Sequence, residues 1–371
     1  MANRPLIPSL NVFREVAGQF PLHGAFLDAQ CYGSGHINDT FLACFDQAGV
    51  RVRYIFQRIN GNIFKNVPHL MENISRVTSH LAGKASGGDH RRALTLVQAR
   101  NGASFYTTPE GEFWRVFLFV EGARTHDAIE TPLQAFEAAR AFGQFQQSLA
   151  DLPGGRLHET IPGFHDTPKR FEALRSAAGT DPVGRKGEVQ SELEFAFQRE
   201  SEAGRLLDLV CAGHIPERVT HNDTKLNNVM LDDATGEGIC VIDLDTVMPG
   251  LSLYDFGDLV RSATNTAVED ETDPSKIDVS LPVFEAIVRG YVAGAGDILT
   301  EAEWENLVFA GKLMTYEVGI RFLADYLQGD IYFKIRHPRQ NLDRARNQFR
   351  LVNRMETLAG AMSKVVFQQR P

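Results

Sequence analysis

The feature that most limits the fold of this chain is a change of secondary-structure signal near Glu121 and Gly122. Before it, short aromatic and β-branched runs alternate with turn residues, which is typical of strands, and one stretch has helical spacing. After it, helical spacing dominates. The sequence therefore predicts an α+β protein with a small β-rich lobe and a larger, mainly helical lobe. The strands are predicted at 41–45, 52–56, 93–97, 103–106 and 113–120, and the helix at 67–81.

The second part of the chain contains three further helical regions. Residues 133–149 and 191–209 have helical spacing, and helix dominates again from 281 onward, with breaks near 294–296 and at Pro338. Residues 150–170 contain many Pro and Gly residues, which predicts a loop. A chain of 371 residues is long enough for two lobes. We expect an N-terminal lobe at 1–118, a hinge at 119–122 and a C-terminal lobe at 123–371.

Charge and cysteine usage exclude several classes of protein. The net charge of −9 argues against a polyanion-binding surface, so no nucleic-acid partner is expected. The four cysteines have no CxxC spacing, which favours a reduced setting over a disulfide framework or a zinc site. No signal peptide and no apolar run of membrane-spanning length is found in the sequence. These features predict a cytoplasmic protein with no membrane partner.

A polar segment in the helical half leads into a β-hairpin. The segment 219–228 is rich in Asn, Asp and His, and two short apolar runs, 229–231 and 239–242, follow it around a turn at 232–238. This spacing predicts that Asn228 and Asp243 come together at the open end of the hairpin. Asp223 lies just upstream in the loop.

These residue types suit phosphate chemistry. An amide oxygen and a carboxylate are hard oxygen ligands for a Mg²⁺ ion that carries phosphates. A separate aspartate, held off the metal, can accept a proton from an attacking hydroxyl. The order His221, Asp223, Asn228 and then Asp243 fits that division of work. Polar turn residues around a hairpin would explain one or two of these positions but not the whole set.

A glycine-containing segment, 32–41, precedes the first predicted strand. Gly33 and Gly35 would let backbone amides approach phosphate oxygens, although a plain β-turn is the alternative. Asn38 stands where a third glycine of GxGxxG would be, and a strand follows instead of the helix that a dinucleotide fold needs. Strand, glycine loop and strand is the arrangement of kinases.

Four segments together resemble a known superfamily. GSGHINDTF, YIFQRIN, VTHNDTKLNNVML and VIDLDTVMPG resemble the aminoglycoside phosphotransferase and choline kinase superfamily, which has a protein-kinase-like fold. FHDTPKRFE, LYDFGD and IRFLADYLQGDIYF narrow the resemblance to the N-acetylhexosamine 1-kinases. Those enzymes transfer phosphate from ATP, with Mg²⁺, to the anomeric hydroxyl of N-acetylglucosamine and N-acetylgalactosamine.

The resemblance implies a role for individual residues. Asp223 would be the catalytic base, His221 would brace the catalytic loop, and Asp255 would tie that loop to a neighbouring helix. Asn228 and Asp243 would bind Mg²⁺, and Asp245 would assist the metal or contact a sugar hydroxyl. The nucleotide would be bound by Gly33, Ser34, Gly35 and Gln57, and by the adenine-facing hinge residues Phe119, Val120 and Glu121.

One position departs from the superfamily pattern. The strand residue that is usually Lys or Arg aligns with Gln57, so the familiar ion pair with a helical glutamate, here Glu72, is in doubt. Arg58 could supply the charge if the register slips by one residue. However, such a slip would turn the side chain to the other face of the sheet.

A long apolar helix is the predicted acceptor-binding element. It opens with a capping box, Thr300 with Glu303, and it carries Glu317, Arg321 and Asp325 at intervals of four residues. This stripe either faces solvent as a salt-bridge ladder or lines a polar cavity. The resemblance implies that the sugar is contacted by Arg321, Tyr332, His36, Asp223 and Asp245.

The sequence thus predicts a phosphotransferase that uses ATP and Mg²⁺ and accepts an alcohol group of an N-acetylhexosamine. One alternative keeps the fold and changes the acceptor to an amino alcohol, homoserine or an aminoglycoside. Another is a nucleotide-binding pseudokinase that serves as an interaction module. Arg321 and His36 argue against cationic acceptors, and the intact Asp223, Asn228 and Asp243 argue against a pseudokinase.

Overall fold

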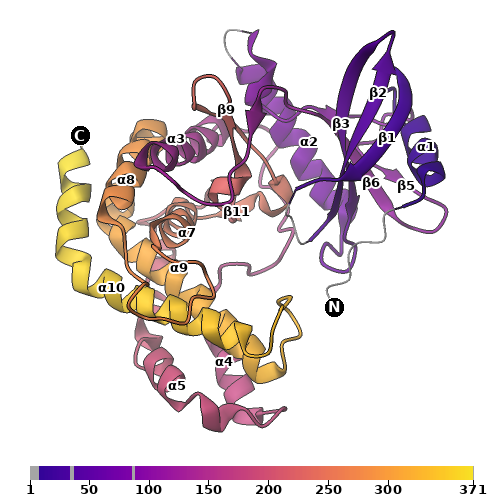
Figure 1. Cartoon of the computed structure of the whole chain (residues 1–371). Coiled ribbons are helices and arrows are strands. Elements are labelled where there is room, and N and C mark those ends of the chain that lie inside the picture. Colours follow the sequence, from indigo (N-terminus) through magenta and orange to yellow (C-terminus); the bar gives the residue numbers. More distant parts are fainter. Residues whose placement is uncertain (1–7, 34–36, 86–87, 371) are drawn as a thin grey trace. The chain divides into compact units, whose positions relative to one another are not determined.

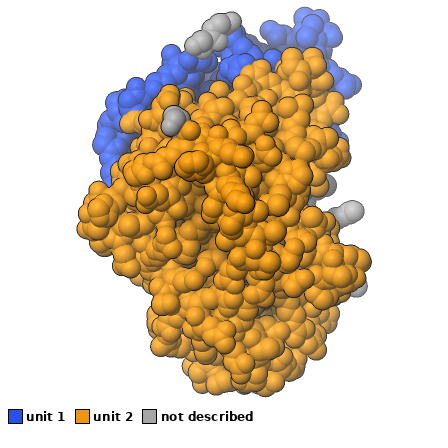
Figure 2. Space-filling view, turned by 90° about the vertical axis from the view of Figure 1, so that its left-hand side faces the viewer, with its two compact units in different colours: residues 1–123, 151–162, 239–248 blue, residues 124–150, 163–238, 249–371 orange. Residues whose placement is uncertain are grey.

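A computed structural model of the chain describes residues 8–33, 37–85 and 88–370. The chain divides into two compact units, which Figure 2 colours separately. Unit 1 comprises residues 1–123, 151–162 and 239–248, and unit 2 comprises residues 124–150, 163–238 and 249–371. Unit 1 therefore contains two segments from later in the sequence, and the second of them carries Asp243 and Asp245. The lobe boundaries at 118 and 122 remain a prediction.

Unit 1 is built on one antiparallel sheet, visible in indigo and purple in Figure 1. Its strand order is β1-β2-β3-β6-β4, and β5 also pairs with β6. The elements are α1 (Leu10–Gly18), β1 (Ala25–Cys31), β2 (Asp39–Gln47), β3 (Val50–Ile59), α2 (Val67–Lys84), β4 (Leu96–Val97), β5 (Tyr106–Thr107) and β6 (Phe113–Leu118).

The predicted strands of unit 1 are present, with corrections to their extent. The strands at 41–45 and 52–56 are confirmed and longer than expected, and the helix at 67–81 is α2. The strand expected at 93–97 is reduced to Leu96–Val97, the one expected at 103–106 is displaced to Tyr106–Thr107, and the one expected at 113–120 ends at Leu118. Helix α1 and strand β1 were not predicted from the sequence. Strand β1 was missed because only one edge of it is paired, and its mixed, mostly exposed residues give no alternating pattern.

Aromatic residues form the core of unit 1 on the face of the sheet that α1 covers. Phe13 of α1 is fully buried, and its ring meets those of Phe41, Phe56 and Trp114 edge-on at centroid distances of 5.0–6.3 Å. These three come from β2, β3 and β6, so one helical side chain joins three strands. Burying such large rings and arranging them edge to face both stabilise this core.

Unit 2 is mainly helical. Its long helices are α3 (Pro132–Leu149), α4 (Thr167–Thr180), α7 (Ser252–Thr264), α8 (Leu281–Ala295), α9 (Glu301–Gln328) and α10 (Gln340–Gln369). Helix α9 packs against α4, α7 and α10, and α3 packs against α8. The shorter elements of this unit are α5 (Gln190–Phe197), α6 (Arg205–Cys211), β8 (Arg218–Thr220), η5 (Leu226–Asn228) and β9 (Val229–Asp232). The 3-10 helix η6 (Leu244–Thr246) belongs to unit 1, and the residues of β7 (Ala123–Arg124), β10 (Gly238–Val241) and β11 (Met248–Gly250) are divided between the two units.

Glycines allow α3 and α8 to pack closely. A Cβ added at Gly290 of α8 would collide with the carbonyl oxygen of Phe136, and one at Gly294 would collide with that of Arg140. A Cβ at Gly143 of α3 would lie 2.8 Å from the carbonyl oxygen of Tyr291. The two helix backbones approach at distances that leave no room for side chains. This explains why helix-weakening glycines occur inside both helices.

Two helical predictions in unit 2 need correction. Residues 191–209 do not form one helix, because α5 ends at Phe197 and α6 starts at Arg205, with a short turn between them. Residues 150–170 are not loop throughout, since α4 begins at Thr167. Asp166 caps that helix by accepting from the N–H of Lys169, and Pro168 lies in its first turn. This Asp-x-Pro start is a local signal that the sequence analysis overlooked.

The hairpin turn and the capping box are confirmed. The N–H of Asp232 donates to the carbonyl of Glu237 at 2.9 Å, and the carboxylate of Asp232 accepts from the turn amides of Ala234 and Thr235. Thr300 and Glu303 cap α9 reciprocally. Of the helices in the described ranges, none combines the length and apolar character needed to cross a bilayer.

Candidate functional site

The loop that carries Asp223 is fixed by a buried carboxylate on α7. Asp255, which is 1% exposed, accepts hydrogen bonds from the N–H groups of His221 at 2.9 Å and Asn222 at 2.7 Å. The hydroxyl of Thr224 donates to the carbonyl of Asp255 at 2.6 Å. Burial raises the pKa of Asp255, while the backbone donors oppose that rise. The prediction that Asp255 ties the loop to a neighbouring helix is therefore confirmed.

His221 packs between α3 and the loop that carries Asp223. Its ring is fully buried and meets the rings of Phe142 and Phe145 of α3 at 5.3 and 5.9 Å. Its Nδ1 accepts from the N–H of Asp223 at 3.3 Å. The side chain therefore shapes the backbone of the loop, which agrees with the bracing role expected from the sequence.

Asp223 is partly exposed and held among positive groups. Lys225 places its Nζ 3.0 Å from Oδ2 of Asp223, and the amide of Asn228 donates to the same oxygen at 3.2 Å. Burial favours the neutral acid, but the charges of Lys225, His221 and Arg261 outweigh burial and hold the pKa of Asp223 below its ordinary value. Asp223 is therefore ionised at neutral pH, as a proton acceptor must be.

Asn228 and Asp243 have the chemistry of oxygen ligands, each within its own unit. The Nδ2 of Asn228 donates to the carbonyl of Asp223 at 2.8 Å, which leaves its carbonyl oxygen Oδ1 without a donor in the described part of the chain. Asp243 is exposed between the half-buried Ile242 and the buried Leu244, and its φ of 58° is left-handed. Non-glycine residues in this conformation are uncommon and gather at functional sites. Both residues fit a Mg²⁺ ligand set.

A buried histidine links α9 to the same loop. Nδ1 of His165 lies 2.8 Å from Oε1 of Glu317, and Nε2 lies 2.9 Å from the carbonyl oxygen of Asn222. Both partners are acceptors, so only the doubly protonated ring satisfies both. Burial lowers the pKa of His165, but the charge of Glu317 outweighs burial and raises it. Burial raises the pKa of Glu317, but the charge of His165 outweighs burial and lowers it.

The three charged residues spaced four apart on α9 have different surroundings. Glu317 and Asp325 are buried, so they neither face solvent nor form a ladder. Asp325 instead accepts from the N–H groups of Ile331, Tyr332 and Phe333 and fixes the segment after α9. Arg321 lines a cavity whose other residues are both polar and apolar, so for this residue the cavity alternative left open by the sequence is closer to the structure than the ladder.

That cavity measures about 130 Å³ and brings Arg321 and Tyr332 together within unit 2. The guanidinium of Arg321 lies 5.5–5.9 Å from the rings of Phe164, Tyr332 and Phe333. A second guanidinium, Arg170, lines the same cavity and donates to the carbonyl of Phe164 at 2.8 and 3.2 Å. Burial and the like charge of Arg321 lower the pKa of Arg170. The cavity is thus rich in cationic hydrogen-bond donors.

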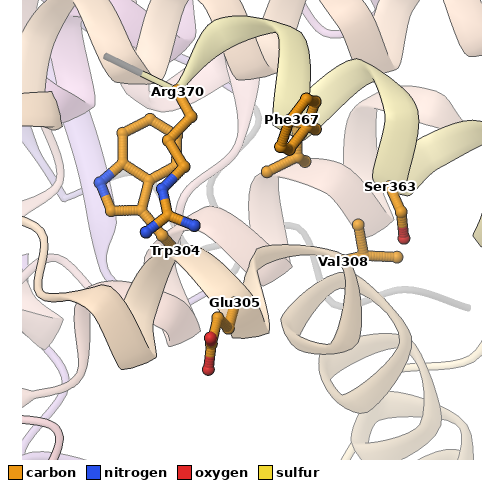
Figure 3. Close-up of a pocket in the computed structure, with 7 residues that line it drawn as sticks. Trp304, Glu305, Val308, Ser363, Phe367 and Arg370 are labelled. Carbon is orange, nitrogen blue, oxygen red and sulfur yellow. The ribbon is translucent and has the colours of Figure 1, made fainter.

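Another cavity of unit 2, of about 150 Å³, lies between α9 and the end of α10 (Figure 3). It contains none of the residues predicted from the sequence. Its lining residues are Trp304, Glu305, Val308, Ser363, Val366, Phe367 and Arg370.

In unit 1, Gln57 and Arg58 lie on opposite faces of the sheet. Arg58 pairs with Asp39 at 2.6 Å and with Glu112 at 2.7 Å. Gln57 donates to the hydroxyl of Thr40 at 3.0 Å. Glu72 of α2 pairs with His158 at 3.0 Å. The ion pair between a strand cation and a helical glutamate is thus absent from these described positions.

A different buried ion pair lies beside Gln57. Arg115 of β6 is the Cα partner of Gln57 in the β3–β6 ladder, and its Nε donates to Oε1 of Gln57 at 2.9 Å. Its Nη1 lies 2.5 Å from Oδ1 of Asp245. Nδ2 of Asn38 donates to Oδ2 of the same carboxylate. Both oxygens of Asp245 therefore already have donors within unit 1.

The expected hinge residues carry their own contacts. Glu121 pairs with Arg53, whose guanidinium lies 4.1 Å from the ring of Phe119. Val120 is buried. Gly33 has a left-handed φ of 77°, which favours glycine there. Ser34, Gly35 and His36 lie outside the described residues.

Residues 29–295, more than half of the chain, match the model of the phosphotransferase enzyme family. The chain belongs to this family. Its fold is similar to that of an aminoglycoside phosphotransferase from Alicyclobacillus acidocaldarius, with a TM-score of 0.64 and 14% identity over 99% of this chain and 98% of that one. A choline kinase from Cryptosporidium parvum is similar with a TM-score of 0.54 and 14% identity over 97% and 100%.

A spectinomycin phosphotransferase in complex with ADP and spectinomycin is similar as well, with a TM-score of 0.60 and 12% identity over 99% of both chains. At these identities the likeness concerns the fold. It confirms the predicted α+β, protein-kinase-like class, with an antiparallel sheet in the N-terminal part and helices in the C-terminal part.

Several residues of this phosphotransferase that matter to the site were missed by the sequence analysis. Lys225 had a local signal, because it stands two residues after Asp223. Arg115 and His165 had none, and Asn38 was noted only as the residue in place of a third glycine, because each of the three meets its partner across at least 57 residues of sequence. One of these residues, His165, is the buried partner of Glu317.

Proposed function

We propose that this phosphotransferase is an ATP- and Mg²⁺-dependent small-molecule kinase that phosphorylates the anomeric hydroxyl of N-acetylhexosamines. The support for kinase chemistry is the family membership together with the loop that presents an ionised Asp223. The support for the acceptor is the resemblance described above and the cavity lined by Arg321, Arg170 and Tyr332.

In this proposal Asp223 accepts the proton of the O1 hydroxyl as O1 forms a bond to the γ-phosphorus. The bond between the γ-phosphorus and the bridging β,γ-oxygen breaks, and ADP leaves. Mg²⁺, with Asn228 and Asp243 as its proposed ligands, would neutralise charge on the β- and γ-phosphates. Asp255 and His221 keep the loop in one conformation, because catalysis of this transfer depends mainly on positioning and electrostatics.

The two guanidinium groups of the cavity favour a neutral acceptor that is rich in oxygen, because the carboxylate that also lines it, Asp325, already accepts from three backbone N–H groups. Guanidinium groups are donors only, so Arg321 and Arg170 suit hydroxyl and carbonyl oxygens. Aromatic rings around Arg321 would cover the apolar face of a sugar ring. An amino alcohol or an aminoglycoside would bring its own positive charge against both arginines, which would cost affinity. This is the reason for preferring a sugar to a cationic acceptor.

The test is incubation of the full chain with Mg-ATP and a panel of free sugars and amines, followed by mass spectrometry and phosphorus NMR. We expect an N-acetylhexosamine 1-phosphate and ADP in equal amounts. A product phosphorylated at C6, or at an acceptor amine or alcohol without sugar turnover, would contradict the proposal.

A further inference from the structure

The buried cation of unit 1 lies on β6, whereas the superfamily pattern places it on the neighbouring strand β3. The sequence leads one to look for it on β3, but Gln57 stands there, and Arg58 lies on the other face with two carboxylate partners of its own. On the face of Gln57 the cation is Arg115, which is 1% exposed. It lies directly across the β3–β6 ladder from Gln57 and is hydrogen-bonded to it.

The partners of Arg115 hold it in one orientation. Gln57 accepts from Nε, and Asp245 accepts from Nη1, while Nη2 has no acceptor in the described ranges of the chain. Gln57 is itself fixed by the hydroxyl of Thr40. A guanidinium that is oriented through two of its three nitrogens can offer the third to a ligand with little loss of side-chain entropy.

The surroundings of Asp245 come from three parts of unit 1. Asn38, the residue before β2, donates to Oδ2, and the hydroxyl of Thr160 donates to the carbonyl of Asp245 at 2.8 Å. Asn73 of α2 donates to the carbonyl of Val247 at 3.1 Å. The short segment that follows Asp243 is therefore held against the sheet and α2 by these hydrogen bonds and by the ion pair between Asp245 and Arg115.

Energetics also argue for a role beyond stability. A buried ion pair gives little net stability, because desolvating both charges offsets most of their attraction, and an apolar pair of similar volume serves as well. The presence of a buried Arg115 beside a polar Gln57 is therefore explained better by a ligand that needs the charge. The proposed nucleotide carries phosphates, and Asp243, their proposed Mg²⁺ ligand, lies two residues before Asp245.

We propose that Arg115 of β6 binds the phosphates of the nucleotide, in place of a cation on β3, and that Asp245 and Gln57 orient its guanidinium. This inference rests on the proposed kinase function, but it concerns the nucleotide alone and holds for any acceptor. It also gives Asp245 a positioning role in place of direct contact with metal or sugar.

The experiment compares affinities for ATP and for adenosine, measured by ligand-observed NMR titration of the full chain. Arg115→Met should weaken ATP binding by about 10- to 100-fold, the range for a lost charged hydrogen bond, and leave adenosine binding nearly unchanged. Arg58→Met is the matched control. It removes an ion-paired arginine from the other face of the same sheet and should alter neither affinity.

A double variant that moves the cation from β6 to β3 tests the site more strictly. Gln57→Lys combined with Arg115→Met moves the cation back across the ladder, and it should recover most of the lost ATP affinity. Arg115→Met/Asp245→Asn removes both charges of the pair. It should regain the thermal stability that Arg115→Met loses, without regaining ATP affinity, because a neutral pair satisfies the core but not a phosphate.

Three results would overturn the inference. They are equal losses of ATP and adenosine affinity in Arg115→Met, full ATP affinity in that variant, or recovery of ATP affinity in Arg115→Met/Asp245→Asn. Failure of the proposed function looks different. In that case the unmodified chain itself would bind neither ATP nor adenosine, and the inference would fall with it.

Discussion

Asp223 combines partial exposure with a depressed pKa, and this combination is what a base for hydroxyl activation needs. Its carboxylate is kept ionised by the charges of Lys225 and His221 and is oriented by the amide of Asn228. The backbone on either side is fixed through Asp255. The side chain can therefore accept a proton without first moving or losing a proton of its own.

Replacement of Asp223 by Asn keeps the size and the hydrogen-bonding ability of the side chain but removes the proton acceptor. Turnover should fall by about 10²- to 10⁴-fold, the usual contribution of a general base, while ATP affinity changes little. The measurement is kcat under saturating Mg-ATP, with ATP affinity determined separately. A variant that keeps its turnover would show that the base is another group.

Arg321 is expected to act on the acceptor alone. Arg321→Ala removes charged hydrogen bonds and should raise the acceptor KM by about 10- to 100-fold, with the KM for ATP nearly unchanged. Arg175→Ala on α4 is a suitable control, since that arginine is exposed and pairs with Glu200 outside the cavity. An equal rise in both KM values would place Arg321 outside the acceptor site.

At the scale of elements, unit 2 depends on how closely its helices pack. Helices α3 and α8 approach each other through Gly143, Gly290 and Gly294, so their contact is made by backbone atoms. The same α3 carries Phe142 and Phe145, which cover His221, and Gln146, which donates to Asp255 at 2.5 Å. A shift of α3 would therefore reach the loop that carries Asp223.

Gly290→Ala should destabilise the protein by about 1–3 kcal/mol, the range for overpacking, because the new methyl group meets the carbonyl of Phe136. Gly360→Ala in α10 is the matched control. Nothing lies within 4 Å of the added methyl there, so helix propensity should stabilise the chain by about 0.5–1 kcal/mol. Denaturant unfolding measures both changes. Destabilisation of equal size in both variants would refute the packing explanation.

At the scale of the whole molecule, stability should depend on pH through His165 and Glu317. The pKa of His165 is raised above 6.5, so its contribution is complete below that pH and is lost as the pH rises through the folded pKa. The pKa of Glu317 is lowered below 4.5, so its contribution is complete above that pH and is lost as the pH falls through the folded pKa. Stability from this pair is therefore greatest between the two regions.

Melting temperatures recorded across pH test this dependence. We expect the stability advantage of the unmodified chain over His165→Gln to shrink as the pH rises from about 6.5 into the alkaline range. The melting temperature of Glu317→Gln should be lower than that of the unmodified chain near neutral pH, and this difference should shrink as the pH falls below 4.5. A constant difference across pH for both variants would mean that the pair does not titrate as described.

The sequence by itself determined the features whose signals are local. The change from strands to helices, the hairpin turn at Asp232, the capping box of α9 and the order of polar residues from His221 to Asn228 all follow from short-range spacing. Each depends on a period or a turn within about ten residues, which a single chain displays directly. Where the local signal was weak, as in β1, or was overlooked, as at Asp166 and Pro168, the prediction failed.

Only the tertiary structure decided which charges meet. Arg115 and Asp245 are 130 residues apart, and His165 and Glu317 are 152 apart. Whether such groups pair depends on which strands become neighbours, on their register and on the face each side chain takes, and no local pattern contains that information. For this reason the sequence identified Gln57 as an anomaly, and the β3–β6 ladder was needed to reveal the cation beside it.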